Sequence, residues 1–193
     1  MTTILLARHG QSDWNAAGRW QGHADRPLTE LGRRQAALLA AELAGVPLDA
    51  AYASDLRRAW QTAEIALAGR GLEIIRLTGL REVHVGSWSG LSRQEVAERF
   101  PAAFERWRSG GHGWEDGEPY EAMAARVVAT VHRIAEAHPG GRVLAVSHGG
   151  PIRALKAHAL AITVEEHRLA HLVEENAAVS TIVVENGSIR LLD

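Results

Sequence analysis

Two short apolar runs constrain the fold of this chain more than any other feature of its sequence. Ile4–Ala7 and Val143–Val146 are apolar at every position, without the alternation of polar and apolar residues that marks a half-exposed strand. Such runs are typical of strands that are buried on both faces, as in parallel sheets covered by helices on both sides. The sequence therefore favours an α/β protein.

The rest of the chain alternates predicted strands with predicted helices. Further strands are expected at Ala50–Ala53, Ile74–Leu77, Ala178–Val184 and Ile189–Leu192, and helices at about 30–44, 55–68, 92–107, 119–138 and after Pro151. Ser54 or Asp55 is expected to cap the second of these helices. This order predicts a three-layer α/β/α sandwich around a mostly parallel central sheet. With 193 residues and no linker, we expect a single domain over 1–193.

Composition excludes several classes of function. The net charge of −2 predicts no nucleic-acid or anionic-membrane partner. The absence of cysteine excludes disulfides, a thiolate nucleophile and cysteine-ligated metals. No signal peptide and no apolar stretch of the roughly 20 residues that a membrane span needs is visible, so we expect a cytoplasmic protein. It would be a monomer or a homodimer that acts on a small molecule.

Both apolar runs end in a histidine followed by glycine, in "ILLARHG" and "VLAVSHGG". In open α/β sheets, ligands bind at the edge where the strands have their carboxyl ends. The glycines allow close backbone approach, and the helix expected after Gly149 offers free N–H groups to an anion. His9 and His148, with Arg8 beside the first, therefore point to one shared anion site.

Two further segments contribute candidate residues. In "SDLRRAWQT", Arg57 lies in the first turn of a helix, where a cation opposes the helix dipole unless an anion is near. Its neighbour Arg58 is expected on the surface. In "LREVHVGSW", Glu82 lies in an irregular segment. Gathered in one cleft, these groups could hold a phosphoryl group, let a neutral histidine attack phosphorus, and protonate the leaving oxygen.

Four segments in order carry a family resemblance: "RHGQSDWN", "SDLRRAWQT", "LREVHVGSWSG" and "VSHGG". They resemble the signatures of the histidine phosphatase superfamily, which is also called phosphoglycerate mutase-like. "DRPLTELGRRQA" and "DGEPYEAMAARV" are similar to its intervening segments, so the resemblance extends over about residues 4–184. It implies a phosphoric monoester hydrolase that needs no metal or cofactor and works through a phosphohistidine.

The resemblance also implies residue roles. His9 would be the nucleophile, and Glu82 would protonate the leaving alcohol and then activate water. Positive neighbours would keep His9 neutral. The phosphate pocket would consist of Arg8, Arg57 and His148. Further contacts to the phosphate or the substrate are expected from Asn15, Gln21, Gly149, His84 and Trp114.

Two other functions remain possible from the sequence. A cofactor-dependent phosphoglycerate mutase would return the phosphoryl group to its substrate, but the mutases of this superfamily carry an insertion with paired arginines after the glutamate motif. Here "GSWSG" leads straight into a short helical segment. A catalytically inactive phosphate-binding domain would lack the nucleophile or the acid, and this chain has both. Hydrolysis is therefore favoured.

The substrate is less constrained than the reaction. A mobile substrate cap is expected near residues 84–118, over a small phosphorylated metabolite such as a sugar phosphate or a phosphoglycerate-type ester. Asp116 and Glu118 in "GHGWEDGE" disfavour a highly anionic leaving group. No metal is expected, because His167 and His171, although spaced i, i+4, lack the glutamate of the HEXXH motif.

Overall fold

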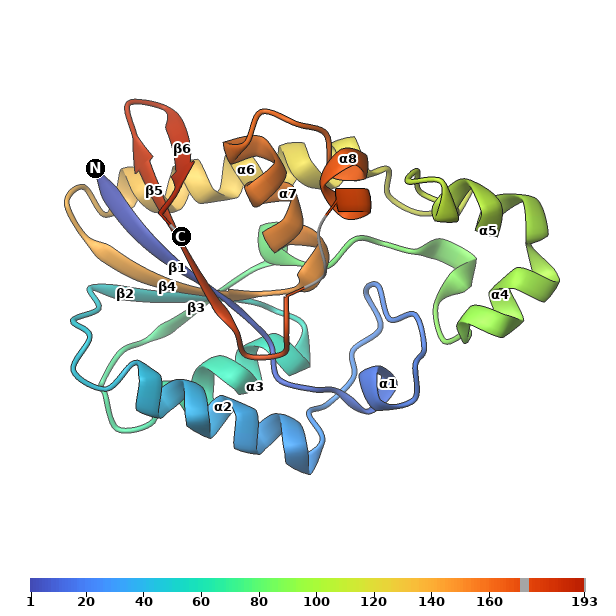
Figure 1. Ribbon diagram of the computed structural model, residues 1–193. Coiled ribbons are helices and arrows are strands. Elements are labelled where there is room, and N and C mark those ends of the chain that lie inside the picture. Colours follow the sequence, from blue (N-terminus) through green and yellow to red (C-terminus); the bar gives the residue numbers. More distant parts are fainter. Residues whose placement is uncertain (171–173, 193) are drawn as a thin grey trace.

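The computed structural model describes residues 1–170 and 174–192, and these form a six-stranded sheet between two helical layers (Figure 1). The strand order is β3-β2-β4-β1-β5-β6. The first four strands in this order are mutually parallel, β5 is antiparallel to β1, and β6 is antiparallel to β5. The strands are β1 (Thr2–Arg8), β2 (Ala50–Ser54), β3 (Ile74–Leu77), β4 (Arg142–Ser147), β5 (Val179–Glu185) and β6 (Ser188–Leu191). The predicted mostly parallel sandwich is confirmed.

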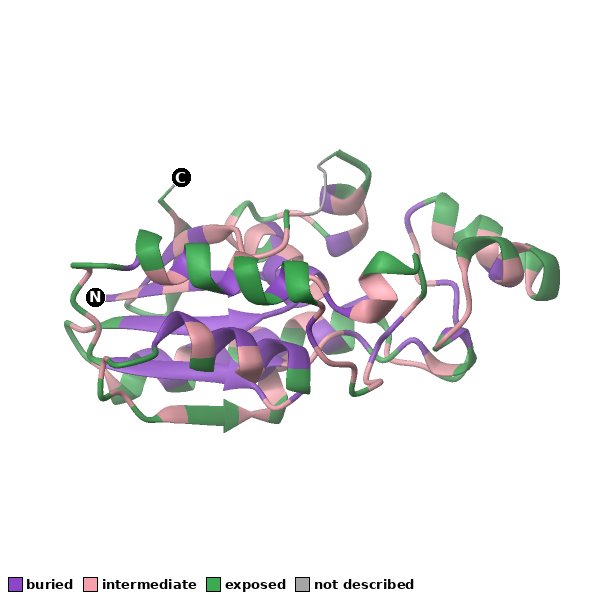
Figure 2. Ribbon diagram, turned by 90° about the horizontal axis from the view of Figure 1, so that it is seen from below, coloured by how far each residue is buried: buried purple, intermediate pink, exposed green. Residues whose placement is uncertain are grey.

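Two pairs of long helices cover the two faces of the sheet. Helices α2 (Glu30–Glu42) and α3 (Arg57–Ala66) pack on one face, and α6 (Tyr120–Ala137) and α7 (Gly149–Ala159) pack on the other. The central strands are buried on both faces, while the outer surfaces of the helices are exposed (Figure 2). This double burial explains why Ile4–Ala7 and Val143–Val146 are apolar at every position. None of the helices in the described residues is both long and apolar enough to span a membrane.

The helix predicted over 92–107 is two helices. Helix α4 (Arg93–Arg99) ends at Phe100, and α5 (Pro101–Arg108) begins with the proline. Proline disfavours the helical conformation of the residue before it, and Phe100 accordingly has φ −133° and ψ 57°. These two helices lie apart from the sheet and form their own lobe at the right of Figure 1.

Four short elements escaped sequence analysis because they lack a full period of apolar residues. They are α1 (Asp13–Ala16), α8 (Val164–Ala170) and the 3-10 turns η1 (Thr78–Leu80) and η2 (Gly86–Trp88). The predicted cap of α3 is also wrong, because Leu56 occupies the N-cap position without a side-chain hydrogen bond. The carboxylate of Asp55 instead accepts from Arg81 Nε at 2.8 Å.

The topology creates a crevice between β1 and β4. These strands are parallel neighbours, with Arg8 opposite Ser147 at their carboxyl ends. The chain leaves β1 toward α2 on one face and leaves β4 toward α7 on the opposite face. Such a switch point between neighbouring strands is where open α/β sheets bind ligands.

The loop after β1 crosses the start of α2 in direct backbone contact, which predicts a stability effect. A Cβ on Gly32 would lie 2.1 Å from the carbonyl oxygen of Gln11. We expect Gly32→Ala to lower the free energy of unfolding by about 1–3 kcal/mol, as overpacking does. Gly111 is the control, because its Cβ would lie 3.5 Å from the nearest atom, and Gly111→Ala should change stability by less than about 0.5 kcal/mol. Urea unfolding measures both, and equal midpoints would contradict the close contact.

Candidate active site

The structure brings the two predicted histidines together at the carboxyl ends of β1 and β4. The backbone N–H of His9 donates to the carbonyl oxygen of Ser147 at 3.0 Å, and His148 is the next residue. The two imidazole rings are edge to face, with centroids 5.0 Å apart, and both side chains are buried. The register of the parallel pair therefore places both rings in one site.

Hydrogen bonding determines which nitrogen of His9 is available for chemistry. Nδ1 lies 2.7 Å from the carbonyl oxygen of Gly10, which can only accept, so Nδ1 carries the proton of the neutral ring and Nε2 carries the lone pair. The pKa of His9 is well below its usual value because the ring is buried and because Arg58 and Arg8 are positively charged. His9 is therefore neutral at physiological pH, with an unprotonated Nε2.

Arg58, and not Arg57, is the arginine of α3 that reaches this site. Its Nε donates to His9 Nε2 at 3.3 Å and to His148 Nδ1 at 3.2 Å, and its terminal nitrogens donate to the carbonyl oxygens of Ala24 at 2.8 Å and Gly22 at 2.9 Å. Burial lowers its pKa to about 10, so it remains charged at neutral pH. The placement of Arg57 in the phosphate pocket is wrong, since its side chain is exposed.

The periodicity of α3 contains the signal that distinguishes the two arginines. The inner face of this helix is made of small buried residues, among them Ala59, Thr62 and Ala63. Arg58 lies four residues before Thr62 and so shares that face, whereas Arg57 lies four residues before the half-exposed Gln61. The expectation that Arg58 faces solvent was wrong. It considered the helix dipole at the first turn, whereas the buried face of α3 decides which arginine points inward.

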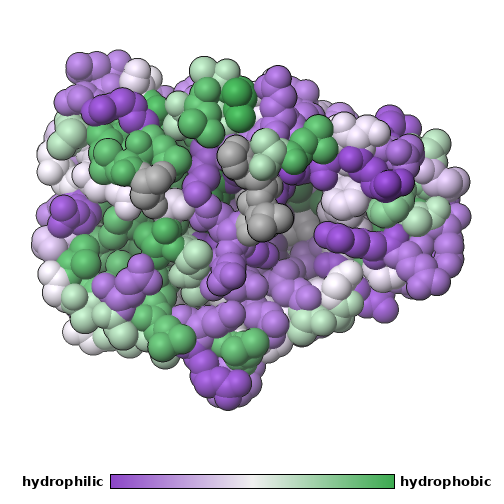
Figure 3. Space-filling view, in the orientation of Figure 1, coloured by the Kyte–Doolittle hydropathy of each residue, from purple (hydrophilic) through white to green (hydrophobic). Residues whose placement is uncertain are grey.

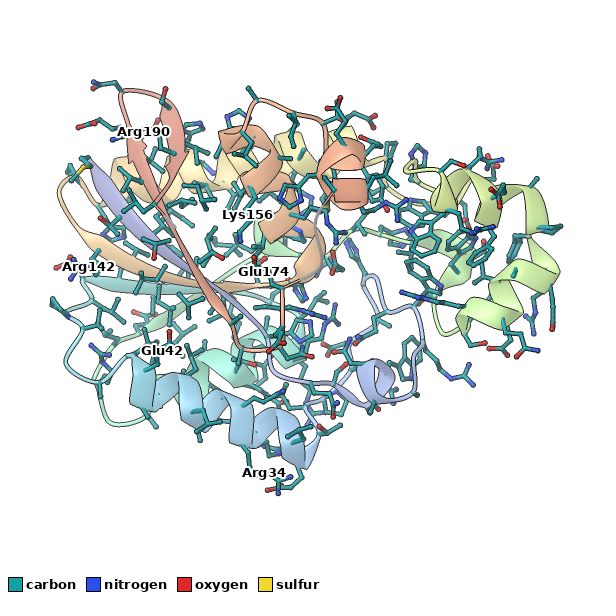
Figure 4. All side chains as sticks on the ribbon, in the orientation of Figure 1. Arg34, Glu42, Arg142, Lys156, Glu174 and Arg190 are labelled. Atoms are coloured by element: carbon teal, nitrogen blue, oxygen red, sulfur yellow. The ribbon has the colours of Figure 1, made fainter. Side chains whose placement is uncertain are left out.

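The side chain of Arg8, the last residue of β1, is held by the segment that precedes β5. Its terminal nitrogen donates to the carbonyl oxygen of Glu174. The carboxylate of Glu174 in turn pairs with Lys156 of α7 and accepts from Ser180 Oγ at 2.8 Å. Figure 4 shows Lys156 and Glu174 side by side above the strand ends. The Nε of Arg8 is buried without a partner in the described residues, and burial lowers the pKa of the guanidinium.

Glu82 is held at the start of α7. Its carboxylate accepts from the backbone N–H of Gly150 at 3.1 Å and from that of Val83 at 2.9 Å. Its carbonyl oxygen lies 2.8 Å from Nε2 of His23. A Cβ at position 150 would lie 2.2 Å from Glu82 Oε1, so the second glycine after His148 makes room for the carboxylate.

Asn15 and Gln21 are oriented by Ser12, the N-cap residue of α1. The Ser12 N–H donates to Asn15 Oδ1 at 3.1 Å, and Ser12 Oγ donates to Gln21 Oε1 at 2.7 Å. Because their side-chain oxygens already accept hydrogen bonds, the amide nitrogens of both residues remain as donors for a ligand. Both residues line the same cavity.

A cavity of about 710 Å³ connects these groups. Its opening is the hollow to the right of centre in Figure 3, where the surrounding surface is mainly hydrophilic. Within the described part of the chain, three buried nitrogens on its wall have no hydrogen-bond partner: Arg8 Nε, Trp20 Nε1 and Arg153 Nε. Nε2 of His148, whose ring packs on the cavity residue His9, is a fourth such nitrogen. Since His148 Nδ1 accepts from Arg58, its Nε2 carries a proton, and all four are donors. Donors converging on one cavity suit an oxyanion.

The remaining predicted residues divide between the cavity and the surface. Gly149 and Trp114 line the cavity. His84 does not line it, because its ring is exposed and packs edge to face on His23 with centroids 4.9 Å apart. Tyr120 and Arg153 also line the cavity, and neither was expected from the sequence, because both lie on helices whose amphipathic patterns indicate only packing.

The site contains no carboxylate cluster of the kind that binds metals. Within residues 1–170 and 174–192, no three histidine, aspartate or glutamate side chains group in a way that could hold a metal ion. His171, one member of the i, i+4 pair, lies outside the described residues. The chemistry available from the described side chains is thus a neutral imidazole base, two buried guanidinium groups and a carboxyl group that faces them across the cavity.

Comparison with known proteins identifies the family of this chain. "Phosphoserine phosphatase 1" of Hydrogenobacter thermophilus is 37% identical over 157 residues, 80% of this chain and 74% of that protein. "Metal-independent phosphoserine phosphatase" of Arabidopsis thaliana is 41% identical over 160 residues, 80% of this chain and 67% of that protein. The solved structure of Bacillus stearothermophilus YhfR has a TM-score of 0.94 at 34% identity and covers 100% of this chain and 96% of that one. The sequence pattern of one family matches residues 4–193. The chain belongs to the histidine phosphatase superfamily (branch 1).

Proposed function

We propose that the protein is a metal-independent phosphomonoesterase that hydrolyses a small phosphorylated metabolite through a phosphohistidine on His9. The observation that carries this proposal is the neutral His9, whose unprotonated Nε2 faces a cavity with buried, unpartnered donors and with Glu82 on its wall. The similarity to phosphoserine phosphatases, one of them named as metal-independent, supports the reaction class.

In the first step, His9 Nε2 attacks phosphorus, an N–P bond forms and the ester P–O bond breaks. Arg8, Arg58 and His148 donate hydrogen bonds to the phosphoryl oxygens and stabilise the charge of the transition state. Asn15 and Gln21 add neutral donors. Glu82 delivers a proton to the leaving oxygen, so that the product departs as an alcohol.

In the second step, the deprotonated Glu82 accepts a proton from water, and this water attacks the phosphohistidine. The N–P bond breaks, inorganic phosphate leaves and His9 regains its lone pair. Each group returns to its starting state, so the cycle balances with water as the only co-substrate. Since the cations are supplied by arginine side chains, no step requires a metal.

Three further statements belong to the same proposal. Residues 84–118, which include α4 and α5, act as a mobile cap over the leaving group. Transfer of the phosphoryl group to water, and not back to a phosphoglycerate, is the main reaction. A cytoplasmic location and a monomeric or homodimeric state stay predictions from the sequence.

The nucleophile assignment predicts that His9→Ala abolishes both turnover and phosphoenzyme, because no other side chain of the described residues places a neutral base at this position. Hydrolysis of 4-nitrophenyl phosphate and acid-labile labelling by a ³²P-labelled ester measure the two properties. His158→Ala, at an exposed position of α7, is the control and should retain both. Substantial residual labelling of His9→Ala would refute the assignment.

The two adjacent arginines of α3 offer a matched pair of variants. Arg58→Ala should lower kcat/KM by about 10²–10³-fold, the effect of removing one charge-stabilising donor, while Arg57→Ala should stay within about twofold of wild type. Steady-state kinetics with 4-nitrophenyl phosphate, together with thermal melts to verify folding, measure both. A larger loss for the Arg57 variant would contradict the assignment of Arg58.

The acid role predicts a dependence on the leaving group. In single-turnover phosphorylation, Glu82→Gln should slow an alkyl ester such as glycerol 2-phosphate by about 10²-fold or more, because an alkoxide needs a proton to leave. A 4-nitrophenyl ester, with its much better leaving group, should be slowed far less. If both esters are slowed by the same factor, Glu82 does not act as the acid.

A further inference from the structure

The cavity extends well beyond the phosphate pocket, and this outer part is cationic. Six arginines and only one carboxylate, that of Glu82, line the whole cavity among the described residues, although the chain has a net charge of −2. Two of the arginines, Arg8 and Arg58, belong to the phosphate pocket. The other four lie farther out: Arg19, Arg93, Arg153 and Arg168.

Three of these outer arginines have partners that explain them structurally. Arg19 pairs with Glu95 at 3.0 Å. Arg93 and Arg168 lie over the ring of Trp107, at 5.5 and 4.8 Å from its centroid, and Arg168 also donates to the carbonyl oxygens of Gly110 and Trp107. These contacts hold α4, α5 and α8 together around Trp107, and they engage the guanidinium groups.

Arg153 is different. Within the described residues it has no hydrogen bond and no ion pair, and its Nε is buried. Burial lowers the pKa of its guanidinium, and the negative charge of Glu82 acts in the opposite direction. A partly buried charge without an ion-pair partner is costly, so a bound anion would stabilise this arrangement.

Tyr120 supplies a second donor beside Arg153. It lies at the start of α6, it is buried, and it lines the same cavity. Burial raises the pKa of its hydroxyl to about 12, so the group keeps its proton at neutral pH and can donate a hydrogen bond. A guanidinium fork and a phenol O–H together match the two oxygens of a carboxylate.

The position of Arg153 on α7 sets its distance from the phosphate. Arg153 lies four residues after Gly149, so it is on the same face of the helix, one turn or about 5.4 Å from the N-terminus that the phosphate pocket uses. Glu82, which accepts from Gly150, lies at that N-terminus. An ester whose leaving oxygen meets Glu82 can therefore reach Arg153 with its next few atoms.

Asp116 and Glu118, on which the expectation against a highly anionic leaving group rests, do not line the cavity. Asp116 accepts from the N–H and the hydroxyl of Ser87 at 2.9 and 3.2 Å, and Glu118 pairs with Arg126 at 2.7 Å. Neither lines the cavity wall. The "GHGWEDGE" segment therefore gives no reason against a highly anionic leaving group, because its carboxylates are engaged by Ser87 and Arg126.

We infer that Arg153, with Tyr120, forms a carboxylate subsite, and that the substrate is the phosphomonoester of a small hydroxy acid with its carboxylate a few atoms from the ester oxygen. This inference rests on the proposed phosphomonoesterase function. It names Arg153 as a specificity-determining residue, since it recognises the leaving group and takes no part in phosphoryl transfer.

A pair of esters that differ at one group tests the subsite. D-3-phosphoglycerate carries a carboxylate where sn-glycerol 3-phosphate carries a hydroxymethyl group. Wild type should show a higher kcat/KM for the first ester by about tenfold or more, the range of a charge-assisted hydrogen bond. Arg153→Gln should reduce this ratio toward one, mainly through KM, and Arg153→Lys should retain part of it. Arg34→Gln, the same change on the exposed outer face of α2 (Figure 4), should leave the ratio unchanged.

The outcomes separate the two proposals. If wild type hydrolyses both esters without preference, or if Arg153→Gln lowers both by one factor, the subsite is refuted and the phosphatase function stands. If wild type hydrolyses neither of them nor 4-nitrophenyl phosphate, the proposed function itself fails. The wild-type ratio needs no variant, so the subsite stays testable even if Arg153→Gln does not fold.

Discussion

The parallel pairing of β1 with β4 is the constraint on which the rest of the site depends. It sets Arg8 opposite Ser147, and the two histidines follow at the same edge of the sheet. Because the chain leaves the two strands toward opposite faces, the edge between them stays open. Both strands are buried on both faces, so a shift of register would disturb two packed layers at once. The rings are therefore positioned by the whole core.

Buried cations make the site rigid and also prepare it for an anion. Arg58 joins the two histidines to the backbone of the loop before α2, through the carbonyl oxygens of Gly22 and Ala24. Thr62, one turn later in α3, donates to the carbonyl oxygen of Arg58 at 2.7 Å and accepts from the N–H of Gly10 at 3.0 Å. These contacts fix the positive charges before a ligand arrives, so little reorganisation is needed during phosphoryl transfer.

Sequence reasoning succeeded wherever a residue's place follows from its own element. His9 and His148 come directly after apolar strands, and parallel strands end at a common edge. Glu82 has no such local signal, and its place came from the resemblance of a whole segment. Arg57 and Arg58 are adjacent in a helix, and a choice between them needs the buried face of α3. Arg153 and Tyr120 lie on helices whose sequences indicate only packing.

The sequence by itself determined the α/β class, the alternating elements, and the two histidines at the ends of buried strands, because strand burial and helix periodicity are local properties. Only the tertiary structure decided which arginine faces the histidines, that His84 lies outside the cavity, and that Asp116 and Glu118 serve the loop. Those outcomes depend on which surfaces meet across the sheet edge. Contacts between residues far apart along the chain also left Arg153 without a partner among the described residues.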